Sequence, residues 1–235
     1  DSLTRKYADT DKPHVRMTEL VIEPQYLNFI DIVTSSHNHT DHLDAETLMP
    51  LFRVNPNIAF ICPEANRDFV AQRVQCTRDW PIGMSDGDCI NIMDFAFTGI
   101  PAAHNELKRD AAGHPHFMGY LVEFGPWIVY HSGDTLWHDE IVEALQPFNI
   151  DAAILPINGN KPERRVAGNL DAEEAVRLGQ AIGADVVIPC HYNMFTFNTA
   201  DPQDFVRAAE QAGQGYAVLE AGEKYKHESN RALNQ

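Results

Sequence analysis

The chain has 235 residues, of which 44% are hydrophobic and 9% aromatic, an ordinary composition for a globular protein with a sizeable core. Its net charge of −16 gives an acidic surface that repels phosphate backbones, so we expect no unaided binding to nucleic acid. No apolar run approaches the roughly 20 residues that a membrane-spanning helix needs, and we expect no membrane association.

The absence of certain sequence features predicts the number of domains and the cellular compartment. It has no Ser/Gly-rich linker, no low-complexity tract and no internal repeat, which predicts one domain over residues 1–235. The four cysteines show no CxxC spacing, so neither a zinc ribbon nor a disulfide framework is indicated. We therefore expect a cytoplasmic protein.

The first predicted strand leads into a cluster of metal-binding side chains. Residues 29–34 are an apolar run typical of a buried strand, and shortly after it the chain reads His37-Asn38-His39-Thr40-Asp41-His42. Three imidazoles and one carboxylate thus follow the C-terminal end of a strand, where open α/β sheets place their sites. These groups are ligands for zinc, manganese and iron, so the loop predicts a metal site. The alternative is a polar surface loop that happens to be rich in histidine.

The rest of the chain first meanders through strands and then alternates strands with helices, which predicts two sheets with helices outside. Further strands are expected at residues 58–62, 89–99, 117–124, 127–131, 151–157, 185–189 and 216–219. Helices are expected at residues 45–52, 63–74, around 141–145, at 172–182 and at 201–211, and a loop at 75–88. Asp44 and Asp171 have the positions of helix N-caps, and Gly125-Pro126 predicts a hairpin turn.

Three more candidate ligands each follow a strand-like segment. They are His104, Asp134 in the segment YHSGDT, and His191. Strand ends that each deliver one ligand can converge on one edge of a sheet. Five histidines and two aspartates are too many for one four-coordinate site, and they suit two adjacent metals that share a carboxylate and a water.

The HxHxDH motif, the later lone histidine, the aspartate of SGDT and the last histidine together resemble the metallo-β-lactamase superfamily, over about residues 1–226. Within it, segments 36–44, 130–135 and 184–191 are most similar to L-ascorbate-6-phosphate lactonase and its relatives. The resemblance implies a four-layer αββα sandwich of the α/β (α+β) class. Family members usually begin with two or three earlier strands, and residues 1–4 resemble the end of one, so we expect the first strands to be missing.

The resemblance also implies that two divalent metal ions are held by seven side chains. His37, His39 and His104 would bind the first ion, Asp41, His42 and His191 the second, and Asp134 would bridge them. The lactonases favour manganese and the wider superfamily zinc, with iron as a further option. Asp41 and Asp134 are the expected catalytic residues, and Asp41 would orient the attacking hydroxide and move its proton.

These inferences predict hydrolysis by a metal-bridging hydroxide, acting as a lactonase on a small sugar-like substrate such as L-ascorbate 6-phosphate. A metal-dependent phosphodiesterase is the alternative, and a non-catalytic metal-binding module is the alternative of another class. The expected partner is the small-molecule substrate, with homo-oligomerisation left open. For a phosphorylated substrate, Lys161, Arg164 and Arg165 are the candidate phosphate-binding residues, and the competing interpretation is a solvated flexible loop.

Overall fold

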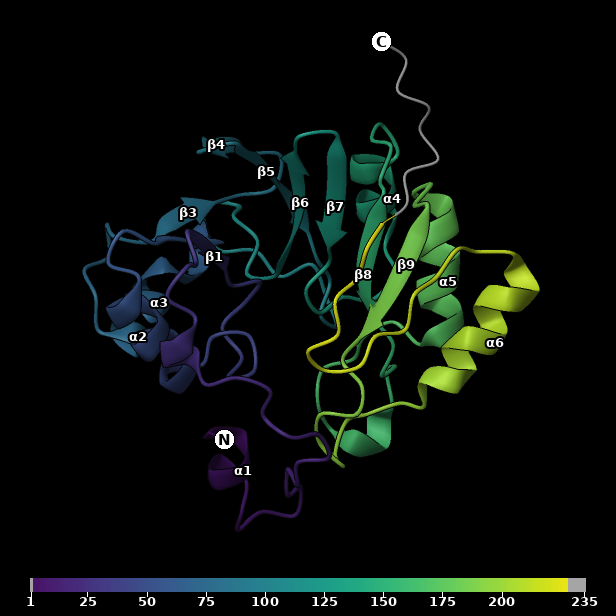
Figure 1. The fold of residues 1–235 in the computed structure, drawn as a ribbon, viewed down its shortest axis with the longest axis horizontal. Coiled ribbons are helices and arrows are strands. Elements are labelled where there is room, and N and C mark those ends of the chain that lie inside the picture. The colour runs from purple at the N-terminus through teal and green to yellow at the C-terminus, as the bar shows by residue number, and fades with distance from the viewer. Residues whose placement is uncertain (1, 228–235) are drawn as a thin grey trace.

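The strands form two sheets, and the computed structural model describes residues 2–227 (Figure 1). The smaller sheet is parallel and has the order β1 (Ile32–Thr34), β2 (Ala59–Pro63), β3 (Ile82–Met84). The larger sheet has the order β4 (Cys89–Ile92), β5 (Phe95–Pro101), β6 (Met118–Phe124), β7 (Trp127–His131), β8 (Ala152–Pro156), β9 (Val186–Cys190). Strands β4 to β7 are antiparallel neighbours, and β8 and β9 extend the sheet in parallel.

The described helices are short. They are α1 (Ser2–Lys6), α2 (Ala45–Val54), α3 (Arg67–Val74), α4 (Asp139–Leu145), α5 (Ala172–Ala181) and α6 (Pro202–Ala212). Asp44 and Asp201 accept hydrogen bonds from backbone amides of the first turn, and Asp171 forms a capping box with Glu174. No helix in the described part of the chain is long and apolar enough to cross a membrane.

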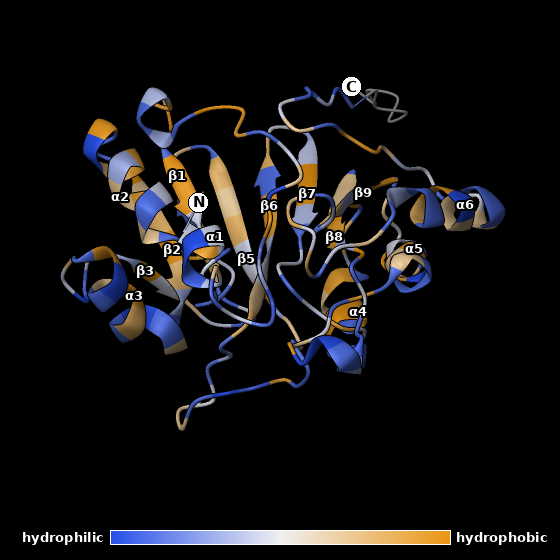
Figure 2. Cartoon of the chain, turned by 90° about the horizontal axis from the view of Figure 1, so that it is seen from below, coloured by the Kyte–Doolittle hydropathy of each residue, from blue (hydrophilic) through white to orange (hydrophobic). Residues whose placement is uncertain are grey.

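Alternate strand positions pack into different layers. In β2, Phe60 and Cys62 join a core with α2 and α3, whereas Ile61 lies in a second core between the sheets. In β6, Tyr120 faces that second core, and Leu121 packs into a third core with α4, α5 and α6. Successive strand residues point to opposite faces, so both sheets are covered on both sides. The expected αββα sandwich is confirmed, with α2 and α3 on one side and α4 to α6 on the other (Figure 2).

Several predicted strand boundaries are wrong. Residues 29–31 do not pair as a strand, because the amide of Ile30 donates to the side chain of Asn55 and Phe29 is exposed. The predicted strand 89–99 is two strands, since the chain turns at Met93, whose φ is 53°. The expected loop 75–88 contains β3, which is too short to show a periodic pattern. At the end of the chain, Tyr216 makes a single bridge to β9 in place of the strand expected at 216–219.

The structure also differs from the prediction in the helix expected at residues 63–74 and in the strand end expected at residues 1–4. The predicted helix 63–74 begins as a 3₁₀ turn, η2 (Glu64–Asn66), before α3, and Pro63 belongs to β2. The expectation that residues 1–4 end a strand is wrong, because Ser2 to Lys6 form α1, while residue 1 lies outside the described residues. Between α1 and β1 the only regular element is the 3₁₀ turn η1 (Pro24–Tyr26), so β1 is an edge strand of the described sheet.

Candidate metal centre

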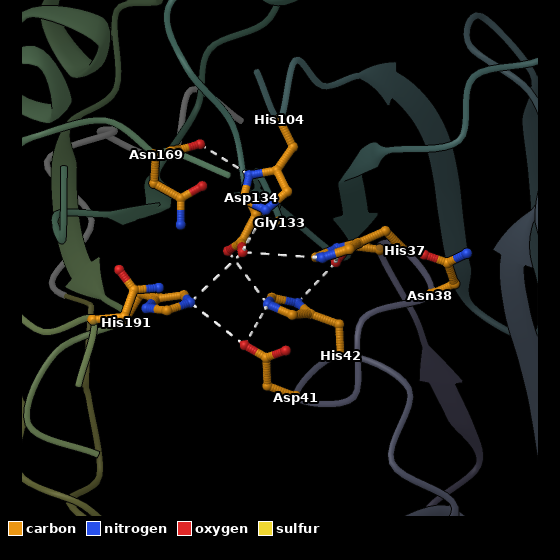
Figure 3. Close-up of polar contacts among 12 residues, drawn as sticks. His37, Asn38, Asp41, His42, His104, Gly133, Asp134, Asn169 and His191 are labelled. Carbon is orange, nitrogen blue, oxygen red and sulfur yellow. Dashed lines mark hydrogen bonds and ion pairs between the residues drawn. The ribbon is translucent and has the colours of Figure 1, made fainter. Parts of the chain in front are cut away.

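The seven residues that the sequence predicts as metal ligands gather in two groups that share Asp134. One group is His37, His39, His104 and Asp134, and the other is Asp41, His42, Asp134 and His191. Within each group, one ligand atom of every residue lies within 4.8 Å of the others. Figure 3 shows the Asp134 carboxylate between the two groups, and its side chain is only 5% exposed.

Four imidazoles direct Nε2 at the Asp134 carboxylate. The Nε2 to carboxylate oxygen distances are 3.3 Å for His42, 3.6 Å for His191, 3.7 Å for His104 and 4.0 Å for His37. The Asp41 carboxylate lies 3.6 Å from His42 Nε2 and 3.5 Å from His191 Nε2. Neutral imidazoles and carboxylates converging in this way suit hard or borderline divalent cations, and no thiolate takes part in either group.

One serine orients a histidine in each group. The Ser36 hydroxyl oxygen lies 3.0 Å from His37 Nδ1 and 2.9 Å from His42 Nδ1. A ring that offers Nε2 to a metal carries its proton on Nδ1, and a hydroxyl oxygen has two lone pairs. Ser36 can therefore accept both protons at once and fix both rings in the metal-binding tautomer. The ligand pattern in the sequence did not indicate this role, although Ser36 directly precedes the HxHxDH motif.

We expect Ser36→Ala to weaken metal binding in both groups about ten- to a hundredfold, the usual cost of removing a residue that orients metal ligands. Competition with a metal-binding dye would measure both affinities. Ser132→Ala is the matched control, because Ser132 is also buried beside Asp134 but its hydroxyl donates to a backbone carbonyl. Unchanged affinities in Ser36→Ala would show that the imidazoles do not need this hydroxyl.

His104 is oriented by a distant backbone carbonyl. Its Nδ1 lies 2.9 Å from the Gly168 carbonyl oxygen, 64 residues further along the chain, so Nδ1–H donates and Nε2 is free for a cation. The amide of Gly168 in turn donates a hydrogen bond to the side-chain oxygen Oδ1 of Asn105 at 2.9 Å. The loop after β8 therefore helps to set the first group, which the spacing of the ligands alone did not indicate.

Backbone conformations with positive φ place two of the converging side chains. Gly133, with φ of 61°, precedes Asp134, and a Cβ there would lie 2.5 Å from Ser36 Cβ, so no larger residue fits. His191 also has φ of 61°, an uncommon conformation for histidine that turns the chain directly after β9. Strained residues of this kind persist where the surroundings hold them, often at functional sites.

Charges in the two groups are strongly coupled. Burial would raise the pKa of Asp134, but the imidazoles of His42 and His191 hold that pKa well below its usual range. Burial would lower the pKa of His191 and His42, but the charges of Asp134 and Asp41, together with hydrogen bonding to these carboxylates, outweigh it and raise both pKa values. Burial lowers the pKa of His37, assisted by the charge of His42. Without metal, protons on His42 and His191 therefore balance the carboxylates.

These shifts predict how the stability of the metal-free protein depends on pH. His42 and His191 have raised folded-state pKa values, so their contribution is complete below the unfolded pKa of about 6.5 and is lost as pH rises through the folded values. His37, His39 and His104 have lowered pKa values, so the unfolded state takes up protons and stability falls below about pH 6.5.

We therefore expect the chelated protein to be most stable near pH 6.5, with its melting temperature falling on both sides. Thermal denaturation between pH 5 and 9 would measure this, and added divalent metal should remove the alkaline decline because the cation replaces the protons. A melting temperature that rises steadily from pH 6.5 to 9 in chelator would contradict the assignment.

The residues present fit a bound cation. His37 Nε2 is buried, has no hydrogen-bond partner among the described residues and points towards Asp134 at 4.0 Å. A buried imidazole nitrogen without a partner costs free energy unless an unseen partner satisfies it. A divalent cation between His37, His39, His104 and Asp134 would supply that partner.

A cleft of about 920 Å³ opens above the two groups. His39, Asp41, His42, His104, Asp134 and His191 all line it, together with segments from both ends of the chain. His131 lines the cleft as well, and burial lowers its pKa to about 4, which keeps it neutral. The volume is that of a small-molecule site.

The predicted phosphate-binding residues are separated by the structure. Arg165 lines the cleft and pairs with Asp11. Lys161 is exposed and, like Arg164, is not among the described residues that line the cleft. The Arg164 guanidinium donates to the carbonyl oxygens of Asn158 and Thr199, so it ties two loops together.

A third group of possible ligands, Asp151, Asp185 and His227, lies apart from this centre. Asp151 and Asp185 directly precede β8 and β9, whereas His191 directly follows β9. The group is therefore at the opposite edge of the larger sheet, and Asp151 there accepts a hydrogen bond from the amide of Ile128.

Comparison with known proteins agrees with this geometry. A family profile described as "Beta-lactamase superfamily domain" matches residues 13–192. A UPF0173 metal-dependent hydrolase of Hyperthermus butylicus is 28% identical over 205 residues, covering 86% of this chain and 83% of the relative. A probable L-ascorbate-6-phosphate lactonase of Escherichia coli, UlaG, is 28% identical over 207 residues, and the match spans 57% of that protein's length and 82% of this chain.

Solved structures show the same architecture. Igni18, a metallo hydrolase from Ignicoccus hospitalis, superimposes with a TM-score of 0.69 at 25% identity, over 89% of this chain and 87% of the other. An isothiocyanate hydrolase from Delia radicum gut bacteria has the same TM-score at 18% identity, over 93% and 86% of the two chains, and shares the fold. With the profile covering residues 13–192, the chain belongs to the metallo-β-lactamase superfamily.

Proposed function

We propose that this chain is a dinuclear metal-dependent hydrolase that opens the lactone ring of a small, sugar-like substrate. The observation that carries the proposal is the pair of four-ligand groups joined at Asp134, at the base of a cleft of small-molecule size. The similarity to metal-dependent hydrolases and to a probable lactonase supports the reaction class.

In this proposal the first ion would be held by His37, His39 and His104, the second by Asp41, His42 and His191, and both by Asp134. When bound, such cations would lower the pKa of water far enough to supply hydroxide at neutral pH and would polarise the carbonyl oxygen of the substrate. Manganese and zinc both suit a set of imidazoles and carboxylates without thiolate.

The chain's own groups hold the ligands and move protons. Asp134 is buried, and its low pKa keeps it ionised between the two groups. Asp41 lines the cleft, and although burial acts against ionisation, the hydrogen bond from His191 lowers its pKa. An ionised carboxylate at the open side of the centre can accept a proton from the attacking water and pass it to the leaving oxygen.

A metal-dependent phosphodiesterase is the second candidate, because the same two groups could bind a phosphodiester and cationic side chains line the cleft. Protein loaded with manganese or zinc would be assayed with a panel of lactones that includes L-ascorbate 6-phosphate, and with bis(p-nitrophenyl) phosphate. Lactone turnover supports the proposal. Turnover of the phosphodiester alone favours the second candidate. If the protein turns over neither substrate and holds no stoichiometric metal, the alternative of a non-catalytic module is favoured instead.

A further inference from the structure

The charge of the cleft is opposite to that of the whole chain. The sequence contains 34 acidic and 18 basic residues. Among the described residues that line the cleft, the only carboxylates are Asp41 and Asp134, which belong to the metal-binding groups. The cationic lining residues are Lys6, Lys12, Arg73 and Arg165. A cleft whose lining has an excess of one sign of charge concentrates ligands of the other sign, even on a protein of net charge −16.

Two of these cations come from the N-terminal segment, residues 2–17, which crosses the open side of the site. Figure 1 shows α1 below the two sheets, and Figure 2, which is seen from below, shows α1 in front of them. The segment is fixed at several points, since the amide of Met17 donates to the Met194 carbonyl and the amide of Thr196 donates to the Val15 carbonyl, each at 2.9 Å. Lys6 and Lys12 lie outside residues 13–192, the part that matches the family profile.

The four cations differ in the protein groups that they already contact. Arg165 pairs with Asp11. Arg73 donates to the Asn38 carbonyl at 2.8 Å and so supports the loop that carries the HxHxDH motif. The Arg165 charge is therefore paired with a carboxylate, whereas the Arg73 guanidinium has no carboxylate partner among the described residues but is held by the carbonyls of Asn38 and Leu43.

Lys6 and Lys12 have only uncharged hydrogen-bond partners. Lys6 Nζ donates to Thr40 Oγ1 at 2.9 Å, which places an ammonium group beside the metal-binding loop. Lys12 Nζ donates to the Arg165 carbonyl at 3.0 Å and lies 5.9 Å from the centre of the Phe197 ring. Neither ammonium forms a salt bridge with a residue in the described ranges, so both can bind an added anion without breaking an existing ion pair.

We propose that Lys6 and Lys12 form an anion-binding subsite of the cleft, so that the substrate carries a carboxylate or a phosphate in addition to the bond that is hydrolysed. The inference rests on the proposed function for the identity of that bond, but the subsite itself rests on the two lysines. It assigns to the N-terminal segment the phosphate-binding role that the sequence suggested for Lys161, Arg164 and Arg165.

The test measures binding without turnover. Glycerol phosphate, glycerate and glycerol would be titrated calorimetrically into the metal-loaded protein. At least one of the two anions should bind ten- to a hundredfold more tightly to the wild type than to the double variant Lys6→Met, Lys12→Met, because the ammonium charges are lost while the alkyl chains remain. The difference should shrink as salt is raised, and glycerol should show no difference.

Two controls separate charge from folding. Lys224→Met removes an exposed lysine that does not line the cleft and should bind the anions as the wild type does. The double variant Lys6→Arg, Lys12→Arg keeps the charges and should retain anion binding. If the Met double variant loses affinity for glycerol phosphate alone, the subsite binds phosphate, and if it loses affinity for glycerate alone, the subsite binds carboxylate. Equal anion affinities in the wild type and the Met double variant overturn the proposal.

Hydrolysis of an uncharged lactone by the same proteins keeps the two proposals distinguishable. If lysine-dependent anion binding is found but no lactone is hydrolysed, the lactonase proposal fails and the subsite stands. If the uncharged lactone is hydrolysed equally by all variants and neither anion depends on the lysines, the subsite fails and the hydrolase stands.

Discussion

Replacing Asp134 by alanine should reduce hydrolysis by at least a thousandfold and empty both metal groups. Asp134 is the one residue common to the two groups, and four imidazoles surround its carboxylate. Two divalent cations about 4 Å apart repel by on the order of 15 kcal/mol at an effective dielectric constant of about 20, and a shared carboxylate offsets part of this repulsion. Elemental analysis and steady-state kinetics of the variant would measure both losses.

Two further variants sharpen that experiment. Asp134→Asn keeps the shape of the side chain but removes its charge, so it should lose metal nearly as completely if the charge is what matters. Asp94→Ala removes an exposed aspartate of the turn between β4 and β5 and should leave metal content and activity unchanged. An Asp134→Ala protein that retains two metals and full activity would show that another group bridges the ions.

Protein purified without chelator should carry close to two equivalents of divalent metal, and removing them should reduce hydrolysis to the background rate. Each of the two groups offers four ligand atoms within 4.8 Å of one another. Without the cations the protein retains no means of lowering the pKa of water so strongly, and the loss should exceed several kcal/mol of transition-state stabilisation. Elemental analysis before chelation and activity after it give the two readouts.

Readdition separates loss of metal from loss of fold. Manganese or zinc returned in steps should restore activity along with metal content, and full activity at the second equivalent rather than the first would support a shared dinuclear centre. A metal content consistently below one equivalent in active protein would rule out the dinuclear interpretation.

The sequence was sufficient wherever structure depends on neighbours along the chain. Asp44 and Asp171 cap helices because an N-cap needs only a short polar side chain ahead of amides in the same turn. The hairpin at Gly125 follows from a two-residue turn between strands of apolar character. The candidate ligands were recognisable because each imidazole or carboxylate lies in a loop that follows a strand, and strand ends in a sheet meet at a common edge.

Local pattern was least informative for short elements. Strand β3 (Ile82–Met84) has three residues, too few for a period of two to stand out, and its pairing with β2 is what makes it a strand. Residues 29–31 look like part of a strand, but the amide of Ile30 donates to the side chain of Asn55 instead of to a neighbouring strand. In both places hydrogen bonds to residues more than 18 positions away override local preference.

The details of the site were decided by tertiary structure. Gly168 reaches His104 across 64 residues, and Lys12 reaches Arg165 across 153, so no spacing rule in the sequence could have joined them. Arg164 appeared free to bind phosphate, yet the folded loops already use its guanidinium. The identity of a ligand is a property of one side chain and can be read locally. The orientation of that ligand and the charge of the cleft depend on residues from distant parts of the sequence. These residues come into contact only when the chain has folded.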